Sequence, residues 1–163
     1  MDWDQEKATA TVAEFVRMPG GLLPALHSLQ EAFGYVPAEA EAFLADQFNL
    51  TRAHVHGVIS FYHDFRREKP GYHQIKVCGA EACQAVEGRD LLAHIEKKLM
   101  VGAGGTSDNG TFSLDVVYCL GNCAAGPAVM VDGRTYGRVT SQRFDQLISI
   151  AQKKRLQQGA END

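Results

Sequence analysis

The sequence lacks a long hydrophobic run, a surplus of basic residues and a leader-like start. Its 163 residues carry 16 Lys and Arg against 20 Asp and Glu, for a formal net charge of −4. This balance argues against nucleic-acid binding and against a polybasic membrane anchor. No apolar stretch approaches the roughly 20 residues of a spanning helix, so we expect no membrane insertion. The start, MDWDQEK, is too acidic and polar for a signal peptide, and we therefore expect a cytoplasmic protein.

The sequence also lacks the groupings that perform bond-making chemistry. It shows no Ser-His-Asp arrangement and no phosphate-binding loop, because the glycine-rich stretch 102–110 has neither a following lysine nor the order G-x-G-x-x-G. We interpret that stretch as a flexible loop. His54 and His56 are two residues apart and would point about 200° apart on a helix, so they cannot chelate one ion. We interpret them, with His63 and His73, as surface or packing residues, and expect no catalytic residue.

Residues 1–70 contain no cysteine and predict a helical bundle. Apolar residues recur at helical spacing over 5–17 and 22–33, and Gly34 falls where a left-handed cap is expected. A third helix is predicted from Pro37 at its first position to a point near Asn49. Thr51 is a good N-cap for a fourth, short helix.

Residues 71–163 predict a compact α/β unit in the order strand, helix, strand, hairpin, helix. The stretch TFSLDVVY alternates cleanly between apolar and polar residues, which is typical of a strand. Asp132-Gly133 lies between two extended runs and indicates a hairpin. The last helix is predicted through Phe144 and Ala151, with the basic residues 153–155 in its final turn.

All four cysteines lie in this second unit, in the spacings C-x4-C (Cys78 and Cys83) and C-x3-C (Cys119 and Cys123). Each pair begins where a predicted strand ends. If the two strands are neighbours in the sheet, both loops leave the same edge and the four thiolates converge. In the reducing cytosol, two structural disulfides are a poor explanation for such a cluster.

Three kinds of site could be built from the four thiolates. Structural zinc takes four thiolates, although its pairs are usually C-x2-C. A [2Fe–2S] cluster takes two thiolates at each iron, so two separated pairs are a natural supply. A redox dithiol would favour C-x-x-C at the start of a helix. The small residues around the cysteines let backbone N–H groups approach sulfur, which favours the cluster but is compatible with zinc.

The motif order resembles that of a known family. The spacing of Cys78 and Cys83, followed by CLGNC at 119–123, is similar to the thioredoxin-like [2Fe–2S] ferredoxins, and in particular to the 24 kDa-type subunit of NADH:quinone oxidoreductase. The stretches QEAFGYVP, GVISFYHDF and YGRVT extend the likeness over nearly the whole chain. Within the family, FYHDFR and CGAEACQAVEG look most like the gamma subunit of NAD-dependent formate dehydrogenase.

The resemblance implies an α/β protein with an N-terminal helical bundle (1–70) followed by a thioredoxin-like [2Fe–2S] domain (71–163). Cys78 and Cys83 would ligate one iron, and Cys119 and Cys123 the other. The implied role is electron transfer in a formate dehydrogenase complex. The expected partners are a flavin-bearing (FMN) NAD-binding subunit and a large subunit with a molybdenum or tungsten cofactor on molybdopterin, with further iron–sulfur clusters in the partners. The alternatives are a NADH:quinone oxidoreductase, a NAD-reducing hydrogenase and a zinc-stapled interaction module.

Overall fold

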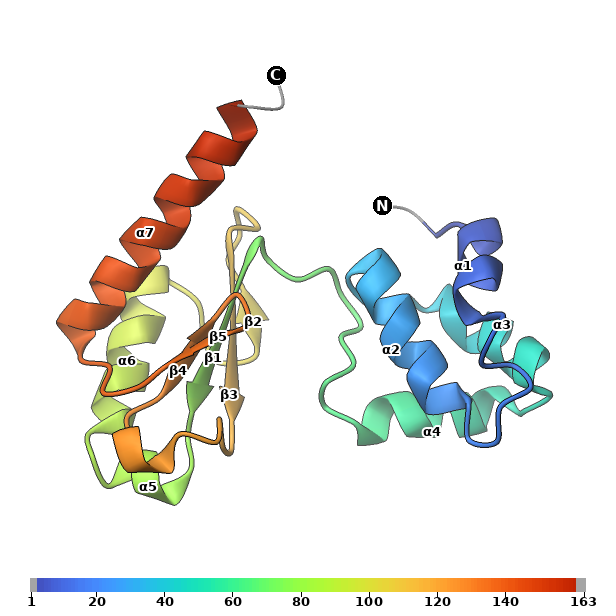
Figure 1. The fold of residues 1–163 in the computed structure, drawn as a ribbon, viewed down its shortest axis with the longest axis horizontal. Helices are drawn as coiled ribbons and strands as arrows, with labels where there is room; N and C mark the ends of the chain where they lie inside the picture. The colour runs from blue at the N-terminus through green and yellow to red at the C-terminus, as the bar shows by residue number, and fades with distance from the viewer. Residues whose placement is uncertain (1–2, 161–163) are drawn as a thin grey trace. The chain divides into compact units, whose positions relative to one another are not determined.

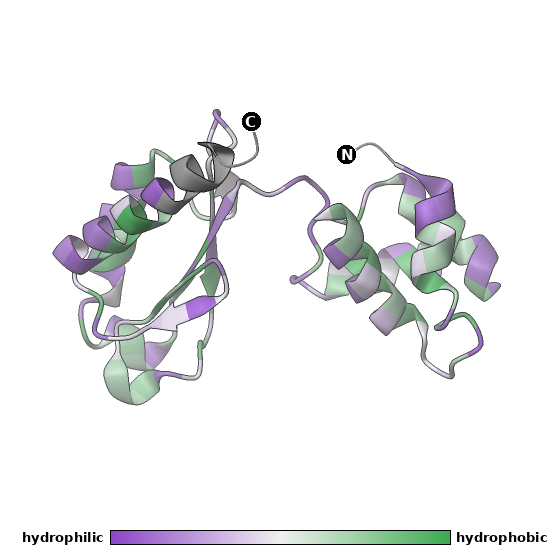
Figure 2. Ribbon diagram, turned by 45° about the horizontal axis from the view of Figure 1, so that its top comes forward, coloured by the Kyte–Doolittle hydropathy of each residue, from purple (hydrophilic) through white to green (hydrophobic). Residues whose placement is uncertain are grey.

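The computed structural model describes residues 3–160, including the side chains up to residue 153, and the chain forms two compact units (Figure 1). The first unit ends at Lys69 and the second begins at Pro70. Among the described residues, no helix is both long and apolar enough to cross a membrane. The segment that joins the units is mostly hydrophilic (Figure 2).

The first unit consists of four helices, α1 (Gln5–Val12), α2 (Leu22–Phe33), α3 (Glu39–Phe48) and α4 (Arg52–Phe61) (Figure 1). Two predicted caps are confirmed. Gly34 adopts a φ of 84° and closes α2, and the Thr51 side chain accepts the N–H of His54 at the start of α4.

Two predicted helix boundaries in this unit are wrong. Helix α1 ends at Val12 instead of continuing to residue 17, because the chain then passes into turns in which Phe15 N–H donates to the Val12 carbonyl. Helix α3 begins at Glu39, two residues after Pro37. Proline has no N–H and a fixed φ, so it fits the approach to a helix as well as its first turn.

The core of the helical unit is apolar, and Leu26, Leu29, Leu44 and Val55 are fully buried in it. Burying a leucine of this kind stabilises the unit by about 2 kcal/mol. The Trp3 ring stacks on Phe33 at 5.4 Å between centroids and packs on the edge of the same core. This unit therefore has a core of its own.

The second unit is built on a five-stranded sheet with the order β2-β3-β1-β4-β5. Its strands are β1 (His73–Cys78), β2 (Gly105–Thr106), β3 (Phe112–Val117), β4 (Val129–Val131) and β5 (Arg134–Tyr136). Strands β1 and β3 pair in parallel, and the other three pairings are antiparallel. The predicted hairpin is confirmed, since Asp132 and Gly133 have φ values of 49° and 80° between β4 and β5.

Helices α6 (Gly88–Leu99) and α7 (Ser141–Ala160) lie side by side on one side of the sheet (Figure 1). Ile95 of α6 and Phe144 of α7 are fully buried against Ile75 and Leu114 of the central strands. Helix α7 continues to Ala160, so the prediction that residues 153–155 form its final turn is wrong.

The interpretation of residues 102–110 as a flexible loop misses a short strand. Gly105 and Thr106 form β2, which pairs with Ser113 and Leu114 at one edge of the sheet. The rest of the stretch is a tight turn in which the Ser107 hydroxyl accepts the N–H groups of Thr111 and Phe112. Glycines hide the strand because they carry no alternating side chains.

Candidate functional site

The parallel pairing of β1 and β3 brings both cysteine loops to one end of the sheet. Cys78 is the last residue of β1 and lies opposite Val117, the last residue of β3. Cys119 follows Val117 by two residues. Parallel strands end at the same edge, so the expected convergence of the two loops follows directly from the register.

The first cysteine pair is buried. Cys78 is 2% exposed and Cys83, on the short helix α5 (Glu81–Gln84), is 1% exposed. Both thiols pack with Ala128, whose carbonyl accepts the Cys78 N–H at 3.0 Å. A Cβ on Gly88 would lie 2.4 Å from the Cys83 carbonyl oxygen, so only glycine allows the chain to turn here from α5 into α6.

The second cysteine pair lies at the surface. Cys119 and Cys123 are exposed, and their Sγ atoms are 3.8 Å apart. Cys123 opens the short 3-10 helix η1 (Cys123–Ala125). Gly121 adopts a φ of 73° and donates its N–H to Cys119 Sγ at 3.3 Å. A glycine at this left-handed position directs a backbone donor at sulfur without steric cost.

The thiols interact electrostatically within and between the pairs. Burial raises the pKa of Cys83, and the hydrogen bond and charge of Cys78 raise it further. The pKa of Cys123 is also raised, chiefly by the hydrogen bond and charge of Cys119, with a contribution from Cys78. Thiolates crowded in this way repel one another, and a cation bound among them removes the repulsion.

The geometry of the exposed pair fits two ligands of one tetrahedral metal. A tetrahedral centre with metal–thiolate distances of about 2.3 Å separates two sulfurs by about 3.8 Å, which is the separation found between Cys119 and Cys123. Among the side chains that the structure describes, up to residue 153, no three His, Cys, Asp or Glu groups gather around a single ion position. Hydrogen bonds join Cys78 with Cys83 and Cys119 with Cys123. This pairing suits a [2Fe–2S] cluster, in which each iron takes two thiolates.

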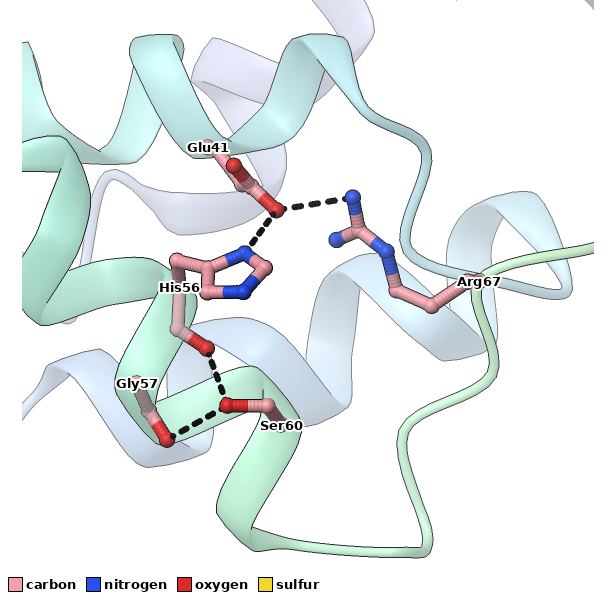
Figure 3. Close-up of polar contacts among 5 residues, drawn as sticks. All are labelled: Glu41, His56, Gly57, Ser60 and Arg67. Atoms are coloured by element: carbon pink, nitrogen blue, oxygen red, sulfur yellow. Dashed lines mark hydrogen bonds and ion pairs between the residues drawn. The ribbon is translucent and has the colours of Figure 1, made fainter.

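His54, His56 and His63 are exposed, and His73 is buried as a packing residue. His56 Nδ1 lies 3.1 Å from Glu41 Oε1, and the same oxygen accepts from Arg67 at 2.7 Å (Figure 3). His73 is buried, and its Nδ1 lies 2.8 Å from Asp132 Oδ2. The backbone N–H of His54 completes the Thr51 cap.

Sequence reasoning missed the importance of Glu41. Burial by itself raises the pKa of this carboxyl, but the hydrogen bond with His56 and the charge of Arg67 bring it below its ordinary value. The carboxylate therefore remains charged in a nearly buried position, where it joins α3, α4 and the segment that follows α4 (Figure 3). Its sequence signal is weak, because a single acidic residue in an amphipathic helix usually faces solvent.

Known proteins resemble this chain along most of its length. It is 37% identical over 131 residues to the HndA subunit of the NADP-reducing hydrogenase of Solidesulfovibrio fructosivorans, covering 80% of this chain and 76% of that protein. It is 32% identical over 135 residues to a subunit of the NADH-quinone oxidoreductase of Aquifex aeolicus, covering 83% and 84% of the two chains. A crystal structure of a NAD+-reducing [NiFe]-hydrogenase superposes with a TM-score of 0.69 at 27% identity, over 82% of this chain and 23% of that one.

The profile of the thioredoxin-like [2Fe–2S] ferredoxin family matches residues 8–152, which include both units and all four cysteines. The predicted fold class, a helical region followed by a thioredoxin-like ferredoxin domain, is confirmed. One [2Fe–2S] cluster is implied by the family, as the resemblance predicted. The chain belongs to the thioredoxin-like [2Fe–2S] ferredoxin family.

Proposed function

We propose that this chain carries electrons in a NAD(P)-linked oxidoreductase complex through one [2Fe–2S] cluster. Cys78 and Cys83 would hold one iron, and Cys119 and Cys123 the other. The observation that carries the proposal is the parallel β1–β3 register, which puts both cysteine pairs at one end of the sheet within a chain of this family. A bound [2Fe–2S] cluster supplies one-electron oxidation and reduction.

The two cysteine pairs give the site a buried side and an exposed side, and the residues around each pair have different roles. The buried pair excludes water from one side of the site, and Ala128 packs against both of its thiols. On the other side, the Gly121 N–H donates to Cys119 Sγ and stabilises negative charge on that sulfur. Because Cys119 and Cys123 are exposed, an electron-transfer partner would approach from their side.

The relatives favour a hydrogenase or a NADH-quinone oxidoreductase as the type of complex. In both, the expected neighbour of this chain is a flavin-bearing subunit that binds the nicotinamide nucleotide. The narrower prediction of a formate dehydrogenase, with a molybdopterin-bearing large subunit, rests on the motifs FYHDFR and CGAEACQAVEG alone. We retain it as the second candidate. The zinc-stapled module is disfavoured by the family match.

Anaerobic purification of the chain tests the cofactor. We expect two irons and two acid-labile sulfides per chain, no EPR signal when oxidised and a spin-one-half signal after dithionite reduction. One zinc without sulfide would overturn the proposal. The isolated chain should neither oxidise formate nor reduce NAD, since no catalytic grouping accompanies the cysteines.

Co-purification from the native organism tests the type of complex. A tagged chain should bring down a flavoprotein together with one large subunit, and the metal of that subunit decides among the candidates. Nickel would identify a hydrogenase, and molybdenum or tungsten a formate dehydrogenase. A set of membrane subunits would identify a quinone reductase. Capture of no flavoprotein under conditions that preserve the cluster would contradict the proposed partner.

A further inference from the structure

A glutamine side chain closes the first cysteine loop. Gln84 directly follows Cys83 and is half-buried. Its Nε2 donates to the carbonyl of Gly79, the residue after Cys78, at 2.6 Å. This hydrogen bond joins the neighbours of the two cysteines, so it limits how far Cys78 and Cys83 can move apart.

An arginine in turn fixes the amide of Gln84. The Arg89 guanidinium donates from Nε and from Nη2 to Gln84 Oε1, at 3.0 and 2.6 Å. A guanidinium only donates hydrogen bonds, so the amide oxygen must face Arg89 and the amide nitrogen must face Gly79. The two donors belong to one rigid planar group, which sets the direction of the amide as well as its distance. We call this chain of contacts, from Arg89 through Gln84 to the Gly79 carbonyl, the Arg89 relay.

The position of Arg89 in its helix is unfavourable for a cation. Arg89 is the second residue of α6, and the first turn of a helix carries partial positive charge. Gly88 brings this turn against the first cysteine loop, since a Cβ on Gly88 would lie 2.4 Å from the Cys83 carbonyl oxygen. The contact with Gln84 therefore gives a reason for an arginine at this point in the chain.

Gly79 connects the relay to the strand that leads to the second cysteine loop. Its N–H donates to the Val117 carbonyl at 2.8 Å, and Val117 lies two residues before Cys119. A Cβ on Gly79 would lie 2.8 Å from Val116 Cγ1, so glycine allows the first loop to approach β3 this closely. The N–H of Gly79 is thus held by β3 and its carbonyl by Gln84.

We propose that Arg89 is a positioning residue for the [2Fe–2S] cluster, which acts through Gln84 by holding the first cysteine loop in the conformation that presents both thiolates to one iron. This role rests on the proposed function, since it requires Cys78 and Cys83 to be ligands. Groups that orient metal ligands commonly alter both the retention and the electronic properties of the metal. The planar fork carries the role and the charge alone does not, because a lysine ammonium cannot hold two donors in one fixed plane.

The first experiment compares Arg89→Lys, Arg89→Gln and Gln84→Met in the cluster-loaded full chain. Loss of iron to an excess of chelator should be about five- to tenfold faster in all three variants, as expected for the loss of one hydrogen bond. The EPR spectrum of the reduced chain should broaden in all three, because a loop that is not fixed holds its sulfurs in several orientations. A wild-type release rate and EPR line shape in Arg89→Lys, with changes in Arg89→Gln, would overturn the proposal in favour of the charge alone.

Lys97→Gln is the matched control for the loss of charge. Lys97 is exposed in the last turn of the same helix, at the opposite end from Arg89. Its substitution should leave the release rate and the EPR line shape unchanged. Faster release in Lys97→Gln, equal to that in Arg89→Gln, would show that the net charge of the helix is responsible and would overturn the relay.

A double variant tests whether Arg89 acts through Gln84. The chain that carries both Arg89→Gln and Gln84→Met should release iron no faster than Gln84→Met alone, because contacts in one network are not additive. A further increase, equal to that of Arg89→Gln in the wild-type chain, would mean that Arg89 acts independently of Gln84. The relay would then be wrong.

The cluster-free full chain tests the relay separately from the proposed function. Iodoacetamide should label Cys83 about five- to tenfold faster in Arg89→Lys than in the wild-type chain, with the labelling rate of Cys119 unchanged, because the buried thiol reacts through local opening of its loop. If the chain held zinc without sulfide, the proposed function would fail, but this measurement would still decide whether the relay holds the loop. An unchanged rate at Cys83, or an equal acceleration at Cys83 and Cys119, would overturn the inference.

Discussion

The two cysteine pairs differ in their surroundings although they are alike in sequence. Cys78 and Cys83 are almost fully buried beside Ala128, whereas Cys119 and Cys123 are exposed. The first pair is held by a strand end and a helix, and the second by a loop with one left-handed glycine. The buried pair is thus part of the folded core, while the exposed pair depends on local turn geometry, and the two should respond differently to the same change.

Alanine substitution in each pair should have the largest effect. Both Cys83→Ala and Cys119→Ala should abolish the cluster, because three thiolates leave one iron with a single protein ligand. Iron and sulfide analysis with EPR measures this result. Full cluster occupancy in either variant would contradict the ligand assignment.

The same two variants should differ in the cluster-free chain. Cys83→Ala should lower the free energy of unfolding by about 1 to 2 kcal/mol because it leaves a void in the core. Cys119→Ala should change it by less than about 0.5 kcal/mol, as at other exposed positions. Urea unfolding of both chains measures the difference. Equal losses would show that the exposed pair is also structural.

Alkylation should distinguish the pairs by rate. In the cluster-free chain, iodoacetamide should modify Cys119 and Cys123 at least about tenfold faster than Cys78 and Cys83, because the reagent must reach the sulfur. The raised pKa of Cys123 shifts its reactive thiolate to higher pH, so its labelling rate should climb as the pH rises through and beyond about 9. Peptide mass spectrometry measures each site. A rate for Cys123 that levels off near neutral pH would contradict the raised pKa.

A glycine substitution should disturb the exposed pair alone. Gly121→Ala places a side chain at a φ of 73°, which costs about 1 kcal/mol. As the loop relaxes, the Gly121 N–H moves away from Cys119 Sγ, and we expect the reduction potential to fall by a few tens of mV. Gly110→Ala is the matched control, since Gly110 has a φ of 63° and equally open surroundings but precedes β3, whereas the cysteine loop follows that strand. This control should lower the free energy of unfolding by a similar amount and leave the reduction potential of the cluster unchanged.

The positions of the cysteines could be predicted from the sequence, but their difference in burial could not. The alternation of Phe112, Leu114 and Val116 predicts β3, and the run into Cys78 predicts β1, so the convergence of the loops follows once those strands pair. Both cysteine loops are rich in small residues, which gives no sign of which one is buried. Burial comes from Ala128, which follows the second loop and packs back on the first pair.

The helical unit illustrates the same limit. Its caps at Gly34 and Thr51 are local and could be predicted. The pairing of Glu41 with His56 and Arg67 could not, because the three residues come from separate segments and each is ordinary in its own. Long-range polar contacts of this kind depend on the packed fold.

A change in the helical unit should have the smallest effect on either cysteine pair. Glu41→Gln removes the charge that pairs with Arg67 and should lower the free energy of unfolding by about 2 kcal/mol near pH 7. The pKa of Glu41 is below its ordinary value in the folded chain, so its contribution is complete above the unfolded pKa and is lost as the pH falls through the folded pKa. The difference in the free energy of unfolding between wild type and variant should therefore be complete above about pH 5 and should disappear below about pH 4.

The exposed Glu39, in the first turn of the same helix, provides the matched control. Glu39→Gln should change the stability by less than about 0.5 kcal/mol at any of these pH values. The EPR signal and iron content should be unchanged in both variants, because each unit has its own core. A loss of iron in Glu41→Gln alone would mean that the folding of the helical unit supports the cysteine site. The difference between the two cysteine pairs would then depend on the folding of the helical unit as well as on the residues around each pair.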